Sequence, residues 1–194
     1  MATDVYEALR NRCSITAVTP DIPPREVIER LIGAAIWAPN HHLTEPWRFH
    51  VLVGAARAAM GEAVARWLET VRDADDPKQR GEISAARKNL NRAPVIIVVS
   101  QLGSDDPVQD LEDYAACCCA TQNLCLAAHA EGLATKWRTG SMATYPAAKQ
   151  HLGLDKKDRI VAFVYVGYPD SGVGPDRRSR TPANVAWFGW DSSV

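Results

Sequence analysis

Two short runs of apolar residues constrain this chain more than any other feature of its sequence. Val95-Ile96-Ile97-Val98-Val99 and Ile160-Val161-Ala162-Phe163-Val164-Tyr165-Val166 contain no charged side chain. A strand with one wet face alternates apolar and polar residues, whereas an uninterrupted run of this length is typical of a strand covered on both faces. The two runs therefore predict the middle of a sheet.

A longer apolar segment between these runs predicts a helix from Leu111 to Glu131. Its centre, Ala115-Ala116-Cys117-Cys118-Cys119-Ala120, is small and apolar on every side. A helix without a polar face is expected to be buried all round, and small side chains let a neighbouring helix approach closely. We predict that this segment is the central helix of the core, at or near a subunit interface.

The remaining periodicity alternates between helices and a strand. Phe49, Val51 and Val53 alternate as in a half-buried strand from Arg48 to Val53. Helical spacing predicts four further helices, two of them separated by a polar break at Asp73-Ala74-Asp75-Asp76-Pro77. These helices are expected at Val5 to Arg10, from Asp21-Ile22-Pro23-Pro24 to about Trp37, at Ala55 to about Arg72, and in a segment ending near Asn91.

Length and charge exclude several classes of protein. With 194 residues and 46% hydrophobic content, the chain fits one domain over residues 1–194 or one subunit of an interlocked dimer. A formal net charge of −1 offers no basic excess for nucleic acid. No basic N-terminal region precedes an apolar run, and no apolar stretch reaches the roughly 20 residues that span a bilayer. We expect a soluble, cytoplasmic protein without membrane partners.

Several chemical motifs are absent from the sequence. Neither G-x-G-x-x-G, nor G-x-x-x-x-G-K-[ST], nor G-x-S-x-G occurs, so dinucleotide, P-loop and serine hydrolase sites are not indicated. Consecutive helical residues point about 100° apart, so Cys117, Cys118 and Cys119 cannot converge on one ion. His41, His42 and His50 show no metal-ligand spacing, and we expect no metal. The odd number of cysteines, five, argues against a disulfide framework.

A polar loop from Ala38 to Phe49 joins two predicted core elements. Pro39 and Pro46 fix their own φ and disfavour helix at the preceding residues, so the stretch between them is expected to be stiff and extended. Its amides and side chains are then available to a ligand. Taken alone, the loop has a structural interpretation too, since many polar loops between prolines bind nothing.

Three other patches fit a planar cofactor that carries a phosphate. An arginine fork and a hydroxyl in Arg12-Cys13-Ser14 suit a phosphate, although a solvated helix end is an alternative. Lys136-Trp137-Arg138-Thr139-Gly140 has the aromatic and polar mixture that suits a ring edge. Gly167-Tyr168-Pro169 leads into the basic segment 175–182, for which a solvated charge run is the structural alternative.

These patches, in this order, resemble the FMN-dependent nitroreductase family across nearly the whole chain. The family's Arg-Arg-Ser is matched by Arg12-Cys13-Ser14, and its Ala-Pro and Gln-Pro-Trp by Ala38-Pro39 and Glu45-Pro46-Trp47. Its Gly-Leu turn after a helix is matched by Gly132-Leu133, followed by Trp137-Arg138-Thr139-Gly140. The small NAD(P)H nitroreductases of the YdjA type are the most similar branch.

The resemblance implies an α+β, nitroreductase-like fold, with a central mixed sheet flanked by helices, a long buried central helix and an interlocked homodimer. It implies one FMN-binding domain whose cofactor lies between two subunits. The implied FMN ligands are Arg12, Cys13, Ser14, Trp37, His41, Trp137, Arg138, Thr139, Arg178 and Arg180. Arg12, Ser14, Arg178 and Arg180 correspond to the phosphate pocket, Trp137, Arg138 and Thr139 to the tract along the cofactor, and Trp37 and His41 to the opposite subunit's contribution.

This chain departs from the family pattern at a few of these positions. Cys13 stands where the pattern often has a basic or polar residue, and Thr16 where a basic residue often lies near the flavin ring. His42-Leu43-Thr44-Glu45-Pro46 replaces Asn-x-Gln-Pro. The residue that polarises the flavin edge is therefore open, with Arg138 and Lys88 as candidates.

The activity implied is hydride transfer from NAD(P)H to FMN, followed by reduction of an organic acceptor of the nitroaromatic or quinone type by a ping-pong mechanism. The cofactor carries this chemistry, so no catalytic side chain is expected from the protein. Two alternatives stay open: a flavin enzyme with different chemistry, such as reductive dehalogenation or flavin fragmentation, and a flavin-binding module without turnover.

Overall fold

The computed structural model describes residues 4–171 and 180–189 of the chain. Its centre is a four-stranded sheet in the order β1-β2-β4-β3, with every neighbouring pair of strands antiparallel. The strands are β1 (Trp47–Val53), β2 (Val95–Gln101), β3 (Ala134–Arg138) and β4 (Arg159–Gly167). The two apolar runs thus form the two central strands, as predicted.

Six α-helices and three short 3-10 helices surround this sheet in the described residues. They are α1 (Val5–Asn11), α2 (Arg25–Ala35), η1 (His41–Leu43), α3 (Ala55–Val71), α4 (Pro77–Asn89), η2 (Leu90–Arg92), α5 (Pro107–Ala130), η3 (Ser141–Thr144) and α6 (Pro146–His151). The 24-residue helix α5 begins where the Asp106 carboxylate accepts hydrogen bonds from the Val108 and Gln109 amides. It ends before Gly132, whose φ of 76° suits glycine.

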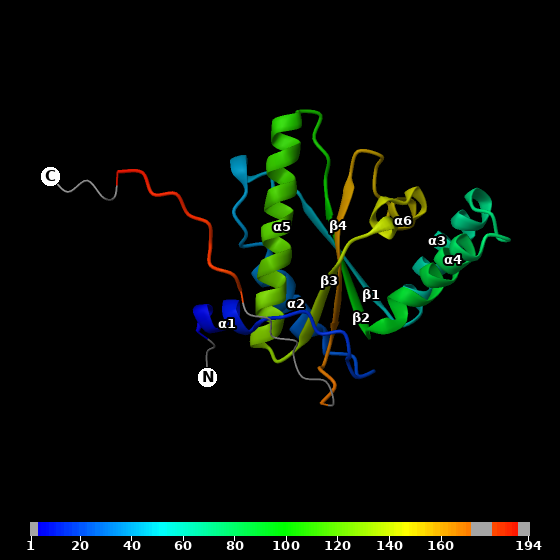
Figure 1. The fold of residues 1–194 in the computed structure, drawn as a ribbon, viewed down its shortest axis with the longest axis horizontal. Coiled ribbons are helices and arrows are strands. Elements are labelled where there is room, and N and C mark those ends of the chain that lie inside the picture. Colours follow the sequence, from blue (N-terminus) through cyan, green and yellow to red (C-terminus); the bar gives the residue numbers. More distant parts are fainter. Residues whose placement is uncertain (1–3, 172–179, 190–194) are drawn as a thin grey trace.

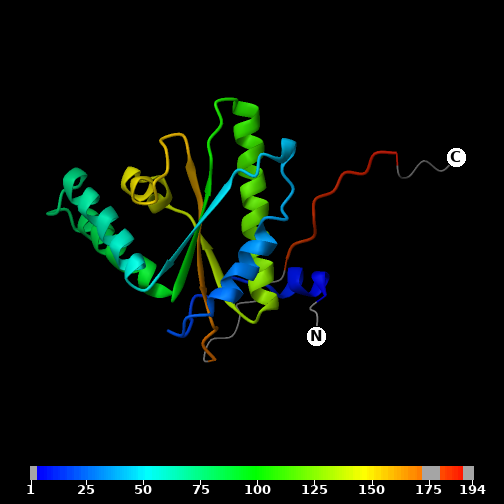
Figure 2. The same cartoon turned by 180° about the vertical axis from the view of Figure 1, so that it is seen from behind.

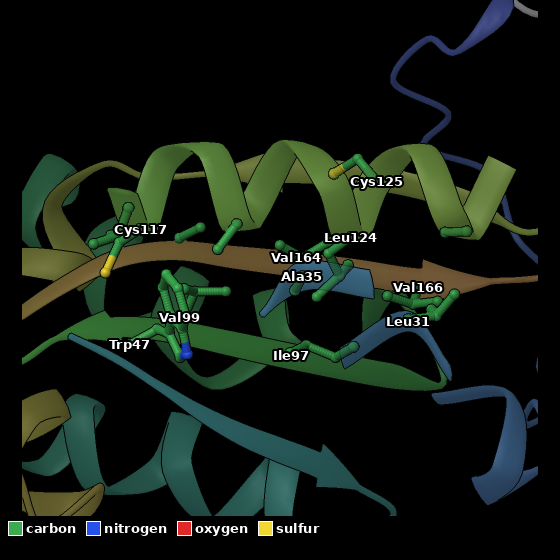
Figure 3. Close-up of a cluster of buried hydrophobic side chains, with 14 of the residues drawn as sticks. Leu31, Ala35, Trp47, Ile97, Val99, Cys117, Leu124, Cys125, Val164 and Val166 are labelled. Atoms are coloured by element: carbon green, nitrogen blue, oxygen red, sulfur yellow. The ribbon is translucent and has the colours of Figure 1, made fainter. Parts of the chain in front are cut away.

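Helices cover both faces of the sheet (Figures 1 and 2). Helices α2 and α5 pack on one face, and α3, α4 and α6 lie over the other. Each face has its own apolar core, one including Leu31 and Leu124, the other Met60 and Phe163. Figure 3 shows side chains of α2, α5 and the central strands meeting in the first of these cores.

The α+β class is confirmed, but the expectation of a mixed sheet is wrong for the described strands. All four pair antiparallel, and the parallel contact is an isolated bridge between Ser14 and Thr135 at the β3 edge. Strand β3 itself was not predicted. It has only five residues, and its mixed side chains Thr135, Lys136, Trp137 and Arg138 give no clear apolar pattern.

Helix α5 is not buried all round, contrary to the prediction. One side packs on the sheet, where Cys117, Ala120 and Leu124 have no exposed surface. The opposite side forms an exposed stripe at helical spacing, made by Val108, Leu111, Ala115 and Cys119. The sheet covers one side only, so burial of the stripe requires something outside the described chain.

We predict that Leu124→Ala lowers the free energy of unfolding by about 2 to 5 kcal/mol, because it leaves a cavity between α5 and the sheet. Leu9→Ala is the matched control, since Leu9 on α1 is 50% exposed, and we expect a change within about 0.5 kcal/mol. Urea denaturation followed by circular dichroism measures both. Equal effects of the two substitutions contradict the packing described.

Candidate functional site

The segment that follows α1 lies along the outer edge of β3. Ser14 forms a parallel bridge with Thr135, and the Ile15 amide donates to the Thr135 carbonyl at 3.0 Å. Two patches that lie more than one hundred residues apart in the sequence, around Arg12 and around Trp137, are therefore brought to one strand. This edge is the first half of the candidate site.

The Arg12 side chain at this edge has a hydrogen-bond donor without an acceptor. Its Nε is buried and has no hydrogen-bond partner among the described residues. The guanidinium lies near the Cys125 thiol, whose pKa is raised by burial and lowered in part by Thr135 and Arg12. A buried donor without an acceptor costs free energy, and a guanidinium fork matches a phosphate in shape and charge. Arg12 therefore suits an anionic group.

The segment after α1 also contains Ser14 and Thr16, whose side chains face solvent. Both are exposed, while the alternating Cys13 and Ile15 are half-buried. In an extended segment residues two apart face the same side. The segment thus presents two hydroxyl groups to solvent, and Cys13 presents only its backbone and a half-buried thiol.

The other predicted residues on β3 divide between the two faces of the sheet. Trp137 packs against the α5 core, while the Arg138 guanidinium lies over the Tyr165 ring at 5.4 Å from its centroid. Arg138 and the exposed Thr139 also line a hollow of about 130 Å³ that includes Asn89 and Met142. The tract therefore reaches an open space beyond the end of β3.

The loop between Pro39 and Pro46 is not extended, which corrects the prediction. It contains the 3-10 helix η1, and three residues other than glycine adopt positive φ: His42 at 57°, Leu43 at 54° and Glu45 at 44°. The Asn40 side chain accepts a hydrogen bond from the Glu45 amide at 3.0 Å and closes the turn. Backbone strain of this kind persists only where surrounding contacts maintain it, and it is concentrated at functional sites.

Those contacts come from the first turns of α5. His41 Nδ1 lies 2.7 Å from Glu112 Oε2, and Thr44 Oγ1 donates to the buried Asp113 carboxylate at 2.6 Å. The loop still presents apolar surface, since Leu43 is 81% exposed and the nearby Trp37 is 86% exposed. The loop is the second half of the candidate site.

The two halves lie at opposite ends of α5. The loop is bound to Glu112, whereas Arg12 lies near Cys125, thirteen residues further along the helix. At 1.5 Å per residue the separation along the axis is about 20 Å. Figure 1 shows the same arrangement, with the light-blue loop beside one end of α5 and α1 beside the other. The predicted site residues therefore do not form one pocket within a single chain.

The C-terminal pair of predicted ligands is described only in part. Arg178 lies outside the described residues, whereas Arg180 is exposed in the segment 180–189. This segment starts close to α1 in both views and then leads away from the body (Figures 1 and 2).

The part of the chain that the structure describes shows no feature of a metal or disulfide site. All five cysteines are free, and burial raises the pKa of the Cys117 thiol to about 12. In residues 4–171 and 180–189, no three His, Cys, Asp or Glu side chains gather around a possible ion position. Among the described helices, none combines the length and apolar character needed to cross a membrane.

Comparison with known proteins identifies the family. The profile described as "Nitroreductase family" matches residues 9–168. The chain belongs to the nitroreductase family. It is thereby placed among oxidoreductase enzymes, and the resemblance proposed from its motifs is confirmed.

Individual relatives are similar to this nitroreductase-family chain over most of its length. YdjA of Escherichia coli strain K12, whose name describes it provisionally as an NAD(P)H nitroreductase, is 31% identical over 86% of this chain and 88% of its own length. The crystal structure of a nitroreductase-like family protein from Bacillus cereus has a TM-score of 0.80 at 30% identity, with 94% and 93% of the two chains covered.

A third similar protein was solved with a ligand. It is a provisionally named nitroreductase from Desulfovibrio desulfuricans in complex with FMN, with a TM-score of 0.67, 27% identity and 94% of each chain covered.

Sequence reasoning missed three contacts in this nitroreductase-family site. It did not find that Thr135 pairs with Ser14, that Lys136 donates to Thr16 at 2.9 Å, or that the Arg138 guanidinium lies over the Tyr165 ring. No local pattern indicates them, because each joins residues far apart in the sequence. A prediction that residues 134–138 form an edge strand would have suggested these contacts.

We predict that Thr44→Val lowers the local stability of the loop by about 1 to 3 kcal/mol, because the buried Asp113 carboxylate loses a donor. Amide exchange of residues 41–45, measured by mass spectrometry, is expected to accelerate. Thr44→Ser retains the hydroxyl and serves as the control. Unchanged protection in Thr44→Val contradicts the anchoring role of this hydrogen bond.

Proposed function

We propose that this protein is an FMN-dependent oxidoreductase that oxidises NAD(P)H and reduces an organic acceptor of the nitroaromatic or quinone type by a ping-pong mechanism. The observation that carries the proposal is the buried, unpartnered Arg12 Nε at the edge of β3, in a chain of the nitroreductase family. The chemistry that bound FMN supplies is acceptance of hydride from NAD(P)H and delivery of electrons to the acceptor. The cytoplasmic location stays a prediction.

The residues present fit a phosphate-bearing planar cofactor. Arg12 and the exposed Ser14 hydroxyl would hold the phosphate, and Arg178 and Arg180 would add positive charge to the same pocket. Cys13 would contribute through its backbone. Trp137, Arg138 and Thr139 would lie along the cofactor, because β3 continues from the same edge.

The role of the protein in this reaction is positional and electrostatic. The cofactor carries the hydride and electron chemistry, so no acid-base pair has to be built. What the chain must supply is a fixed orientation, donors near the ring and exclusion of water from the reacting face. The strained loop with Trp37 and Leu43 offers the apolar cover, although in one chain it lies far from Arg12.

The separation of the two halves supports a homodimer. About 20 Å of helix lies between them, so a loop that covers the cofactor is supplied by another copy of the chain. The exposed apolar stripe of Leu111, Ala115 and Cys119 runs along α5 between the two halves and is suited to pack on a second subunit. Trp37 and His41 would then contact the FMN held by the partner.

The C-terminal segment is a second argument for an interlocked dimer. Val185, Trp187 and Phe188 are 52%, 68% and 94% exposed in an extended segment that leaves the body of its own chain (Figure 2). Apolar side chains presented in this way are typical of arms that pack on another subunit.

We predict that the purified protein is yellow with one FMN per chain, and that NAD(P)H bleaches the flavin bands anaerobically. Titration with NADH and NADPH separately defines the preferred donor. A colourless protein that gains no absorbance with added FMN contradicts the proposal. Turnover of nitroaromatics or quinones separates it from dehalogenation or flavin fragmentation, and a bound flavin that neither nicotinamide reduces favours a binding module.

We expect Arg12→Ala to weaken FMN binding about 10- to 150-fold, since it removes charge-assisted hydrogen bonds worth about 1.5 to 3 kcal/mol. Arg12→Lys keeps the charge without the fork and should lose less. Arg25→Ala, which removes a guanidinium on α2 paired with Glu29, is the control. Quenching of FMN fluorescence gives the dissociation constants, and equal affinity in Arg12→Ala and wild type removes Arg12 from the phosphate pocket.

Dimerisation through α5 predicts that Ala115→Arg produces monomers, because the substitution buries an unpaired charge in the apolar stripe. Val71→Glu places a charge on α3, on the other side of the sheet, and should leave the dimer intact. Sedimentation equilibrium measures the mass of each variant. A monomeric wild-type protein, or dimers in both variants, contradicts the proposed interface.

A further inference from the structure

Three basic side chains line one small hollow at the open edge of the sheet. Lys136 and Arg138 come from β3 and Arg92 from η2, and Thr16 and Tyr165 complete that side of the hollow. No lining residue is acidic, and none of the three cations has an ion pair within the described part of the chain. Positive charges gathered without counterions favour a ligand that carries, or acquires, negative charge.

The three cations are not equivalent. Arg138 is held over the Tyr165 ring at 5.4 Å, and Arg92 is exposed on its short helix. Lys136 instead reaches across the strand edge, where its Nζ donates to Thr16 Oγ1 at 2.9 Å. An ammonium group has three donors, so two of them remain for a ligand.

The position of this ammonium group follows from the segment that carries the proposed phosphate ligands. Ser14 and Thr16 are both exposed on one side of that segment, about 7 Å apart at the rise of an extended chain. Arg12 lies before Ser14 and Lys136 is bound at Thr16, so a ligand that starts at Arg12 and follows the edge of β3 reaches Lys136 further along. Arg12 and Thr16, the acceptor of the Lys136 ammonium group, therefore lie on one continuous segment of backbone.

We propose that Lys136 supplies the positive charge beside the pyrimidine edge of the FMN ring, that Thr16 positions it, and that this charge makes the ring easier to reduce. The inference rests on the proposed function, because it requires that FMN occupy the site. Reduction of the ring increases negative charge at its pyrimidine edge, and a fixed cation in a half-buried position stabilises that charge more than bulk water does. Lys136 is a cofactor-contacting residue here, and Thr16 acts through it.

The test measures the midpoint potential of the FMN-saturated protein. In Lys136→Met the reduced ring is expected to lose about tenfold in relative stability, which is about 30 mV more negative for a two-electron couple. Lys136→Arg retains the charge and should keep the potential near that of the wild type. Lys149→Met is the matched control, because Lys149 on α6 also makes a single hydrogen bond, to the Lys156 carbonyl.

Two further variants test the positioning role of Thr16. Thr16→Val removes the acceptor of the Lys136 hydrogen bond while retaining the charge of Lys136. We expect its midpoint potential to become more negative by less than that of Lys136→Met. The double variant Thr16→Lys with Lys136→Met moves the charge from β3 to the facing segment. Recovery of the wild-type potential in this double variant supports an electrostatic effect rather than a change in packing.

The outcomes separate this inference from the proposed function. FMN content and affinity are measured first, and failure to bind FMN overturns the proposed function. A protein that binds FMN but shows the same potential in Lys136→Met and wild type overturns only the role of Lys136. A variant that raises KM for anionic acceptors at an unchanged potential also overturns it, since the cation then serves the acceptor instead of the ring.

Discussion

Burial of β2 and β4 on both faces is the constraint on which the rest of the structure depends. The runs Val95–Val99 and Ile160–Val166 within these strands are apolar on both faces, so α2 and α5 must cover one face and α3, α4 and α6 the other. The strands at the edges, β1 and β3, are less enclosed. The candidate site forms where β3 meets the segment after α1, because an edge strand leaves backbone groups available to another segment or a ligand.

Helix α5 links the buried core to both halves of the candidate site. It packs on the central strands through Cys117 and Leu124 and anchors the strained loop at its first turns through Glu112 and Asp113. Arg12 lies near its last turns. One rigid helix therefore sets the distance between the proposed cofactor-holding edge and the loop, about 20 Å along its axis. The exposed stripe on the same helix supports the completion of each site by a second copy.

The positive charges at the β3 edge are not balanced by acidic side chains within the described chain. Arg12 retains a buried donor without a partner, and Lys136, Arg138 and Arg92 line a hollow without a carboxylate. Such an arrangement favours a bound anion. The proposed division of work follows: Arg12 and Ser14 hold the phosphate, and Lys136 tunes the ring.

The sequence by itself determined the two central strands, the long helix between them, the absence of common nucleotide and hydrolase motifs, and the family, because these depend on local periodicity and short motifs. Only the tertiary structure decided the antiparallel pairing, strand β3, the left-handed residues of the loop and the bond between Lys136 and Thr16. Those features depend on contacts between residues far apart in the chain. The exposed side of α5 has the same cause: composition indicates that a helix must be buried, but only packing shows which side the chain's own sheet covers.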